Sequence, residues 1–223
     1  MHVVIIMDTI KIILYFSVIF IGFLINFISV VIYNKKYRVL NFENLIISYI
    51  LFIISFLVFS KIGYIIINRN LIIDNKVLPN IVNFFLFGYA FIGGYIGLFV
   101  YSFFSSKIFK CNKLDIMKIY IPNMLILYSI LKIGCFINGC CKGIIPIQII
   151  ESICNLIAYI YICILVKNNK NILNISIIIF GLLRLILSIF RIYNALYIFI
   201  IVEVMCIIII IYGLNLKTGE VDK

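Results

Sequence analysis

Runs of apolar residues dominate this chain and constrain its fold more than any other feature. Stretches rich in Ile, Leu, Phe and Val alternate with short polar segments. Of the 223 residues, 65% are hydrophobic and 12% are charged, which excludes an ordinary soluble domain. Because about 20 apolar residues in a helix cross a bilayer, the sequence predicts an all-α polytopic membrane protein with about seven transmembrane helices. We expect residues 1–223 to form a single integral-membrane domain.

The loops between the predicted spans indicate how the chain is oriented. The spans are Ile10–Tyr33, Leu45–Ile67, Ile81–Phe104, Ile119–Ile137, Ile147–Val166, Ile175–Phe190 and Ala195–Tyr212. The first, third and fifth loops contain nine Lys and Arg residues, whereas the second, fourth and sixth contain four. The positive-inside rule therefore predicts an N-terminus outside the cell and a C-terminus in the cytoplasm.

The formal net charge of +11 fits a membrane surface better than a nucleic acid. Most of the lysines lie in the short loops, where they orient the protein and meet anionic lipid headgroups. We therefore expect membrane lipids as partners, and no nucleic acid.

The segment Lys132–Gly143 holds three glycines, three cysteines, two lysines and an asparagine in twelve positions. Hydrocarbon satisfies no polar group, so a lipid-facing helix would not be built in this way. We interpret the segment as the end of a span that becomes irregular beside a water-lined cavity. On the predicted orientation, Asn138–Pro146 opens toward the outer face, and Asn138 offers a donor and an acceptor to a headgroup.

Ionisable residues inside the predicted spans are costly and are therefore functional candidates. Arg184 lies in the middle of the sixth span, and Arg191 would share its helical face if the helix continued. Two arginines on one face suit a lipid phosphate, because guanidinium groups donate in pairs. The alternative is a structural ion pair of Arg184 with Glu151 or Glu203.

Lys132 and Glu151 flank the irregular segment. Lys132 is either a second phosphate cation or a side chain that extends to the outer interface. Pro146 suits the first turn of a helix, which would place Gln148 and Glu151 on one face. Glu151 is then either a general base or the anchor of an arginine.

The cysteines Cys135, Cys140 and Cys141 have the spacing C-x4-C-C. A disulfide, a reactive thiol and small residues in a tight turn are all compatible with this spacing. A metal site would need a fourth ligand, and the single histidine, His2, is far away in sequence, so we expect no metal. The pair Gly93 and Gly94 permits close approach of a helix or a ligand.

The segment Lys132–Gly143 resembles the signature of the prolipoprotein diacylglyceryl transferase family. It is similar to Arg-x-Gly-Asn-Phe-x-Asn-Gly, and closer to the variant Gly-Cys-Phe-x-x-Gly-Cys-Cys-x-Gly. Three further pieces follow the family's order. Ile92-Gly93-Gly94 resembles His-Gly-Gly, Pro146–Glu151 resembles Pro-x-Gln-Leu-Tyr-Glu, and Phe180–Arg191 resembles Tyr-Gly-x-x-Arg-Phe-x-x-Glu-Phe-x-Arg. The resemblance covers about residues 88–191.

This resemblance implies an enzyme of the bacterial inner membrane that needs no cofactor. It would transfer a diacylglyceryl group from phosphatidylglycerol to the lipobox cysteine in the signal peptide of a prolipoprotein, forming a thioether. The catalytic residues implied are Arg184, Lys132 and Glu151. The substrate-binding residues implied are Gly93, Gly94, Asn138, Gly139, Gly143, Gln148 and Arg191.

The chain departs from the resembled motifs at four positions. Ile92 stands in place of the family histidine, Lys132 in place of an arginine, Phe180 in place of a tyrosine and Ser188 in place of a glutamate. These departures keep an alternative open. The chain would then be a non-catalytic or differently specific membrane paralogue, such as a lipid-binding factor, an assembly factor or a thiol-redox protein.

Overall fold

The structure is a computed structural model that describes residues 2–67, 91–139, 143, 145–167, 171–192 and 196–216. Within these ranges the regular structure is helical. The helices are α1 (His2–Tyr37), α2 (Phe42–Ile67), α5 (Phe91–Ile108), α6 (Lys113–Tyr120), α7 (Met124–Asn138), α8 (Ile147–Lys167), α9 (Ile172–Ser188) and α10 (Leu196–Asn215). The chain divides into two compact units, one made of residues 1–37 and 118–223 and the other of residues 38–117.

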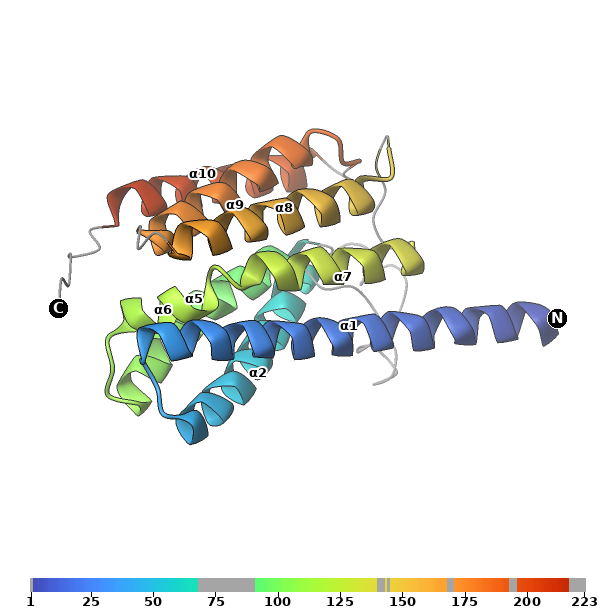
Figure 1. The fold of residues 1–223 in the computed structure, drawn as a ribbon. Coiled ribbons are helices and arrows are strands. Elements are labelled where there is room, and N and C mark those ends of the chain that lie inside the picture. Colours follow the sequence, from blue (N-terminus) through green and yellow to red (C-terminus); the bar gives the residue numbers. More distant parts are fainter. Residues whose placement is uncertain are drawn as a thin grey trace. The chain divides into compact units, whose positions relative to one another are not determined.

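The first unit is a row of helices in the order α1, α7, α8, α9 and α10 (Figure 1). Each helix packs against the next one in the row. Small residues allow this packing, since a Cβ on Gly181 of α9 would lie 2.6 Å from Ile210 of α10. Polar contacts also join α1 to the start of α7, where the Asn26 side chain donates to the carbonyl oxygen of Asn123 over 2.7 Å. The row places α7, α8 and α9 side by side.

The outward faces of these helices are apolar, as expected for contact with lipid. On α8, for example, Ile157, Ile160 and Ile164 are more than half exposed. Four helices of the described part are long and apolar enough to span a membrane, and a fifth span results if the bent pair α6 and α7 counts as one. The prediction of an all-α polytopic membrane protein agrees with this structure, whereas the number of seven spans and the orientation stay predictions.

The fourth predicted span, Ile119–Ile137, is wrong as a continuous helix. The chain instead forms α6 and α7, which meet at an angle of 43°. The break contains Pro122, which has no backbone N–H and disfavours the helical conformation of the residue before it. The third predicted loop is also partly helical, because α5 continues to Ile108 and α6 begins at Lys113.

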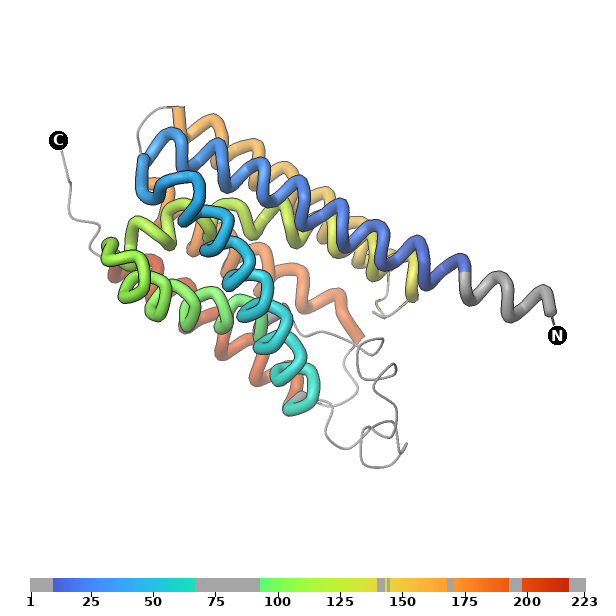
Figure 2. Tube along the Cα trace, turned by 90° about the horizontal axis from the view of Figure 1, so that it is seen from below, coloured from blue at the N-terminus to red at the C-terminus, as the bar shows by residue number. Residues whose placement is uncertain are grey.

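The second unit contains α2 packed against α5 (Figure 2). Three glycines of α5 face α2, and a Cβ on Gly93 would lie 2.2 Å from the backbone oxygen of Phe59. A Cβ on Gly94 would lie 2.4 Å from the ring of Phe56. The two glycines predicted to bind substrate therefore allow close packing of two helices.

We expect Gly93→Ala to lower the free energy of unfolding by about 1–3 kcal/mol, because the new methyl group would overlap backbone atoms of α2. The measurement is denaturant-induced unfolding of the purified protein in detergent micelles. In the control, Gly134→Ala, the methyl group would lie 3.3 Å from the ring of Tyr15, a side chain that can move. This control should change stability by less than ~1 kcal/mol, since alanine favours a helix. Equal effects would contradict the packing role of Gly93.

Candidate functional site

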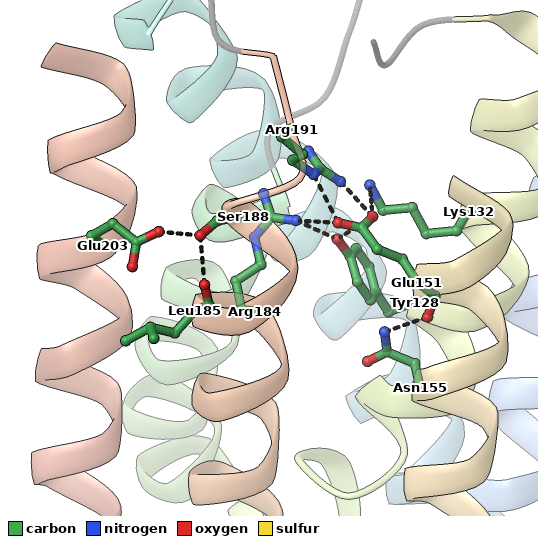
Figure 3. Close-up of polar contacts among 9 residues, drawn as sticks. All are labelled: Tyr128, Lys132, Glu151, Asn155, Arg184, Leu185, Ser188, Arg191 and Glu203. Atoms are coloured by element: carbon green, nitrogen blue, oxygen red, sulfur yellow. Dashed lines mark hydrogen bonds and ion pairs between the residues drawn. The ribbon is translucent and has the colours of Figure 1, made fainter. Parts of the chain in front are cut away.

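Glu151 is the centre of the polar site in the first unit. It lies one turn inside α8 and is 1% exposed. Three cations surround its carboxylate (Figure 3). Lys132 Nζ of α7 lies 2.8 Å from Oε2, and Arg184 Nη1 of α9 lies 3.1 Å from Oε1. Arg191 donates from Nε to Oε1 over 2.7 Å and from Nη2 to Oε2.

Tyr128 completes this set of residues. Its hydroxyl accepts a hydrogen bond from Arg184 Nη1 over 2.7 Å and donates to Glu151 Oε2 over 3.3 Å. The Lys132 ammonium lies 4.9 Å from the centre of the Tyr128 ring, within range of a cation–π contact. We call Tyr128, Lys132, Glu151, Arg184 and Arg191 the Glu151 cluster.

Two features of the backbone position these residues: the spacing of side chains along α7, and the interruption between α7 and α8. Tyr128 and Lys132 are four residues apart on α7, so both side chains lie on one face. Gly139 ends α7 with φ of 63°, a left-handed conformation that suits glycine. Pro146 stands directly before α8, and its carbonyl oxygen accepts from the backbone N–H of Ile149 over 3.1 Å.

Hydrogen bonds between and within the helices hold α7 and α8 beside the cluster. The Ser129 hydroxyl donates to the carbonyl oxygen of Ser152 over 2.8 Å, which ties α7 to α8. The Asn155 side chain donates to the backbone oxygen of Glu151 over 2.6 Å. Glu151 is thereby supported at its backbone as well as at its carboxylate.

Arg191 reaches Glu151 from outside the helix. It would have shared a helical face with Arg184 only if the helix continued, and α9 ends at Ser188, two residues before the predicted end of the sixth span at Phe190. The backbone of Arg191 instead pairs with Gly143 in an antiparallel bridge. A Cβ on Gly143 would lie 2.7 Å from the Ile147 side chain, so a larger residue would require its neighbours to shift.

The structure contains one of the two ion pairs considered for Arg184. Arg184 pairs with Glu151, as described above, while the carboxylate of Glu203 on α10 accepts a hydrogen bond from Ser188 (Figure 3). Ser188 stands where the resembled motif has a glutamate. A carboxylate therefore lies beside position 188, and it comes from α10.

The remaining predicted residues are distributed around this centre. Gln148 is buried on the same side of α8 as Glu151, as predicted. Asn138 and Gly139 are exposed at the end of α7, and Cys135 is half-buried in its last turn. Gly93 and Gly94 belong to the other unit. Cys140 and Cys141 lie outside the described residues, so the predicted thiol site stays a prediction.

Sequence reasoning identified Lys132, Glu151, Arg184 and Arg191, but it missed Tyr128. One signal was present, because Tyr128 precedes Lys132 by one helical turn. Tyrosine is common in membrane spans, however, and its spacing alone does not separate a functional phenol from an ordinary aromatic residue.

The Glu151 cluster is rich in donors and in positive charge. Among the described residues, five donor contacts from four side chains converge on the Glu151 carboxylate. A carboxylate offers about four lone-pair positions, so the donors exceed the places available to them. The described cluster also contains three cations and one carboxylate. Several cationic donors in one place are suited to binding an anion.

Two comparisons relate the chain to known proteins. A family model described as prolipoprotein diacylglyceryl transferase matches residues 2–218. A protein of Clostridium tetani (strain Massachusetts / E88), named phosphatidylglycerol–prolipoprotein diacylglyceryl transferase, is 33% identical over 84 residues. This alignment covers 37% of the present chain and 32% of the relative, so the chain spans about a third of the length of that protein.

We expect Glu151→Gln to lower the free energy of unfolding by about 3–5 kcal/mol, because the substitution leaves three buried cations without their carboxylate. The measurement is again unfolding in detergent micelles. The matched control is Glu203→Gln, since the glutamine oxygen can still accept the hydrogen bond from Ser188. We expect a loss below ~1 kcal/mol for this control. Similar losses in both variants would contradict the central position of Glu151.

Proposed function

The chain belongs to the prolipoprotein diacylglyceryl transferase family, and on this premise we propose that it transfers a diacylglyceryl group from phosphatidylglycerol to the lipobox cysteine of a prolipoprotein. The product is a thioether, and glycerol phosphate leaves. We propose the two substrates as its partners. We also propose that the protein lies in the bacterial inner membrane, with seven spans and its N-terminus outside. The name of the Clostridium tetani relative supports this assignment.

The observation that supports this proposal is the convergence of three buried cations on Glu151. Within the described residues, Lys132, Arg184 and Arg191 share one carboxylate, and their side chains are between 6% and 12% exposed. A phosphodiester headgroup carries a negative charge that a group of three cations would attract. The guanidinium groups suit a phosphate in particular, because each presents several donors in one plane.

The donor excess supports the same ligand. When a phosphate oxygen binds, one of the cations can donate a hydrogen bond to it. The remaining donors still give the Glu151 carboxylate a full set of hydrogen bonds. Binding of the lipid then requires little loss of the existing contacts. We therefore assign Glu151 the role of anchoring the cations.

The cations also suit the chemical step. The cysteine sulfur attacks the glyceryl carbon that is bonded to the phosphate, a sulfur–carbon bond forms, and the carbon–oxygen bond breaks. The departing phosphate takes the bonding electrons and gains negative charge, while the thiol proton ends on glycerol phosphate or in water. Arg184 and Lys132 would stabilise the charge that develops on the leaving group, since prearranged donors act most strongly where charge appears.

The other candidate residues receive supporting roles. We assign contact with the headgroup to Asn138 and Gln148. Gly139 would permit the turn at the end of α7, and Gly143 would permit the backbone pairing that carries Arg191 to the cluster. Gly93 and Gly94 are assigned to packing on α2.

The direct test compares wild type, Arg184→Gln and Arg38→Gln in detergent with phosphatidylglycerol and a lipobox peptide. The thioether product is quantified by mass spectrometry. Arg184→Gln should lower the rate about 100-fold or more, because it removes a donor to the leaving phosphate. Arg38 is exposed and belongs to the other unit, so Arg38→Gln should retain the rate of wild type.

The proposed reaction fails if folded wild type gives no product under conditions in which another family member does. Binding of phosphatidylglycerol without product would then favour a non-catalytic lipid-binding protein. Equal rates for wild type and Arg184→Gln would remove Arg184 from the reaction.

A further inference from the structure

Tyr128 contacts three other members of the Glu151 cluster, which are Glu151, Arg184 and Lys132. It is 3% exposed, and its contacts reach α8 and α9 from α7. Its hydroxyl meets Arg184 and Glu151, and its ring meets Lys132. One side chain therefore orients two of the cations that we assign to the phosphate.

The distances indicate which contact dominates. Arg184 Nη1 lies 2.7 Å from the Tyr128 hydroxyl and 3.1 Å from Glu151 Oε1. The phenol oxygen is therefore the nearer of these two acceptors of this guanidinium nitrogen. The hydrogen bond from Tyr128 to Glu151 is 3.3 Å long, beyond the usual range for two oxygens of about 2.5–3.0 Å.

Phe180 of α9 is the aromatic neighbour of Tyr128. Phe180 precedes Arg184 by one helical turn and occupies the place where the resembled motif has a tyrosine. Its ring meets the Tyr128 ring edge to face, with centroids 6.2 Å apart and planes at 75°. Phe180 has no hydroxyl, whereas Tyr128, which packs against it, has a hydroxyl that accepts a hydrogen bond from Arg184.

We propose that Tyr128 is a positioning residue that directs the Arg184 guanidinium toward the phosphate of the lipid substrate. This inference rests on the proposed function, because it takes a phospholipid phosphate as the ligand. The essential group is the phenol hydroxyl beside Arg184. The aromatic ring alone, which packs on Phe180 and Lys132, is not sufficient.

Tyr128→Phe tests the hydroxyl while it keeps the ring. We expect this variant to form thioether about 10- to 100-fold more slowly and to bind short-chain phosphatidylglycerol more weakly, as for the loss of a hydrogen bond to a charged group. Turnover is measured by mass spectrometry and binding by calorimetry in detergent. The KM for the lipobox peptide should stay unchanged, because Arg184 is assigned to the lipid. The control is Tyr161→Phe, which removes an exposed hydroxyl from α8 and should behave as wild type.

A second variant separates positioning from a structural role. In Tyr128→Phe combined with Phe180→Tyr, the hydroxyl returns on the other ring of the same aromatic pair. We expect this double variant to recover part of the lost turnover and binding. If the double variant recovers nothing and Tyr128→Phe has also lost stability in detergent, the hydroxyl has a structural role and the positioning proposal is overturned.

The outcomes also separate this inference from the proposed function. If wild type forms no thioether but binds phosphatidylglycerol, the proposed reaction fails. The role of Tyr128 is then tested by comparing lipid binding of wild type and Tyr128→Phe. If Tyr128→Phe binds the lipid as tightly as wild type, or forms product as quickly, the positioning role is overturned even though the transferase activity stands.

Discussion

The burial of one carboxylate among several cations is the interaction on which the site depends. Glu151 lies inside a helix whose outer face is apolar, so its charge must be compensated by protein groups. Lys132, Arg184 and Arg191 supply that compensation, and each also needs the carboxylate. Ion pairs of this kind contribute little net stability, yet removing one partner is costly because the others are left buried. The cluster thereby holds α7, α8 and the end of α9 in one arrangement.

The fold supplies this arrangement through adjacent helices and interruptions between them. The row α1, α7, α8, α9 and α10 makes α8 the common neighbour of α7 and α9. Gly139 and Pro146 mark the end of one helix and the start of the next. The backbone bridge between Gly143 and Arg191 then joins the segment before α8 to the segment after α9. Irregular backbone at such a place is typical of membrane proteins whose sites lie between helices.

Much of this could be predicted from the sequence, since the physics involved is local. A charged residue within an apolar span is costly, and this rule includes Glu151 and Arg184 among a few candidates. The order of the motifs adds Lys132, and the family comparison covers residues 2–218. The sequence did not identify Tyr128, because an aromatic residue in a span has no distinctive pattern. The end of α9 before Arg191 was predicted to within two residues, but the pairing of Arg191 with Gly143 was not.

The sequence by itself determined the apolar helices, the cations available to the site and the glycines and prolines that interrupt the spans. These properties follow from the free energy of transferring side chains into lipid and from backbone geometry. Both depend on a local stretch of sequence no longer than one span, about 20 residues. The tertiary structure decided which cations share Glu151 and which hydroxyl faces Arg184. It also decided that Glu203 lies beside Ser188. Such pairings join residues far apart in the chain, and they depend on which helices pack together and at what rotation, which helical periodicity does not specify.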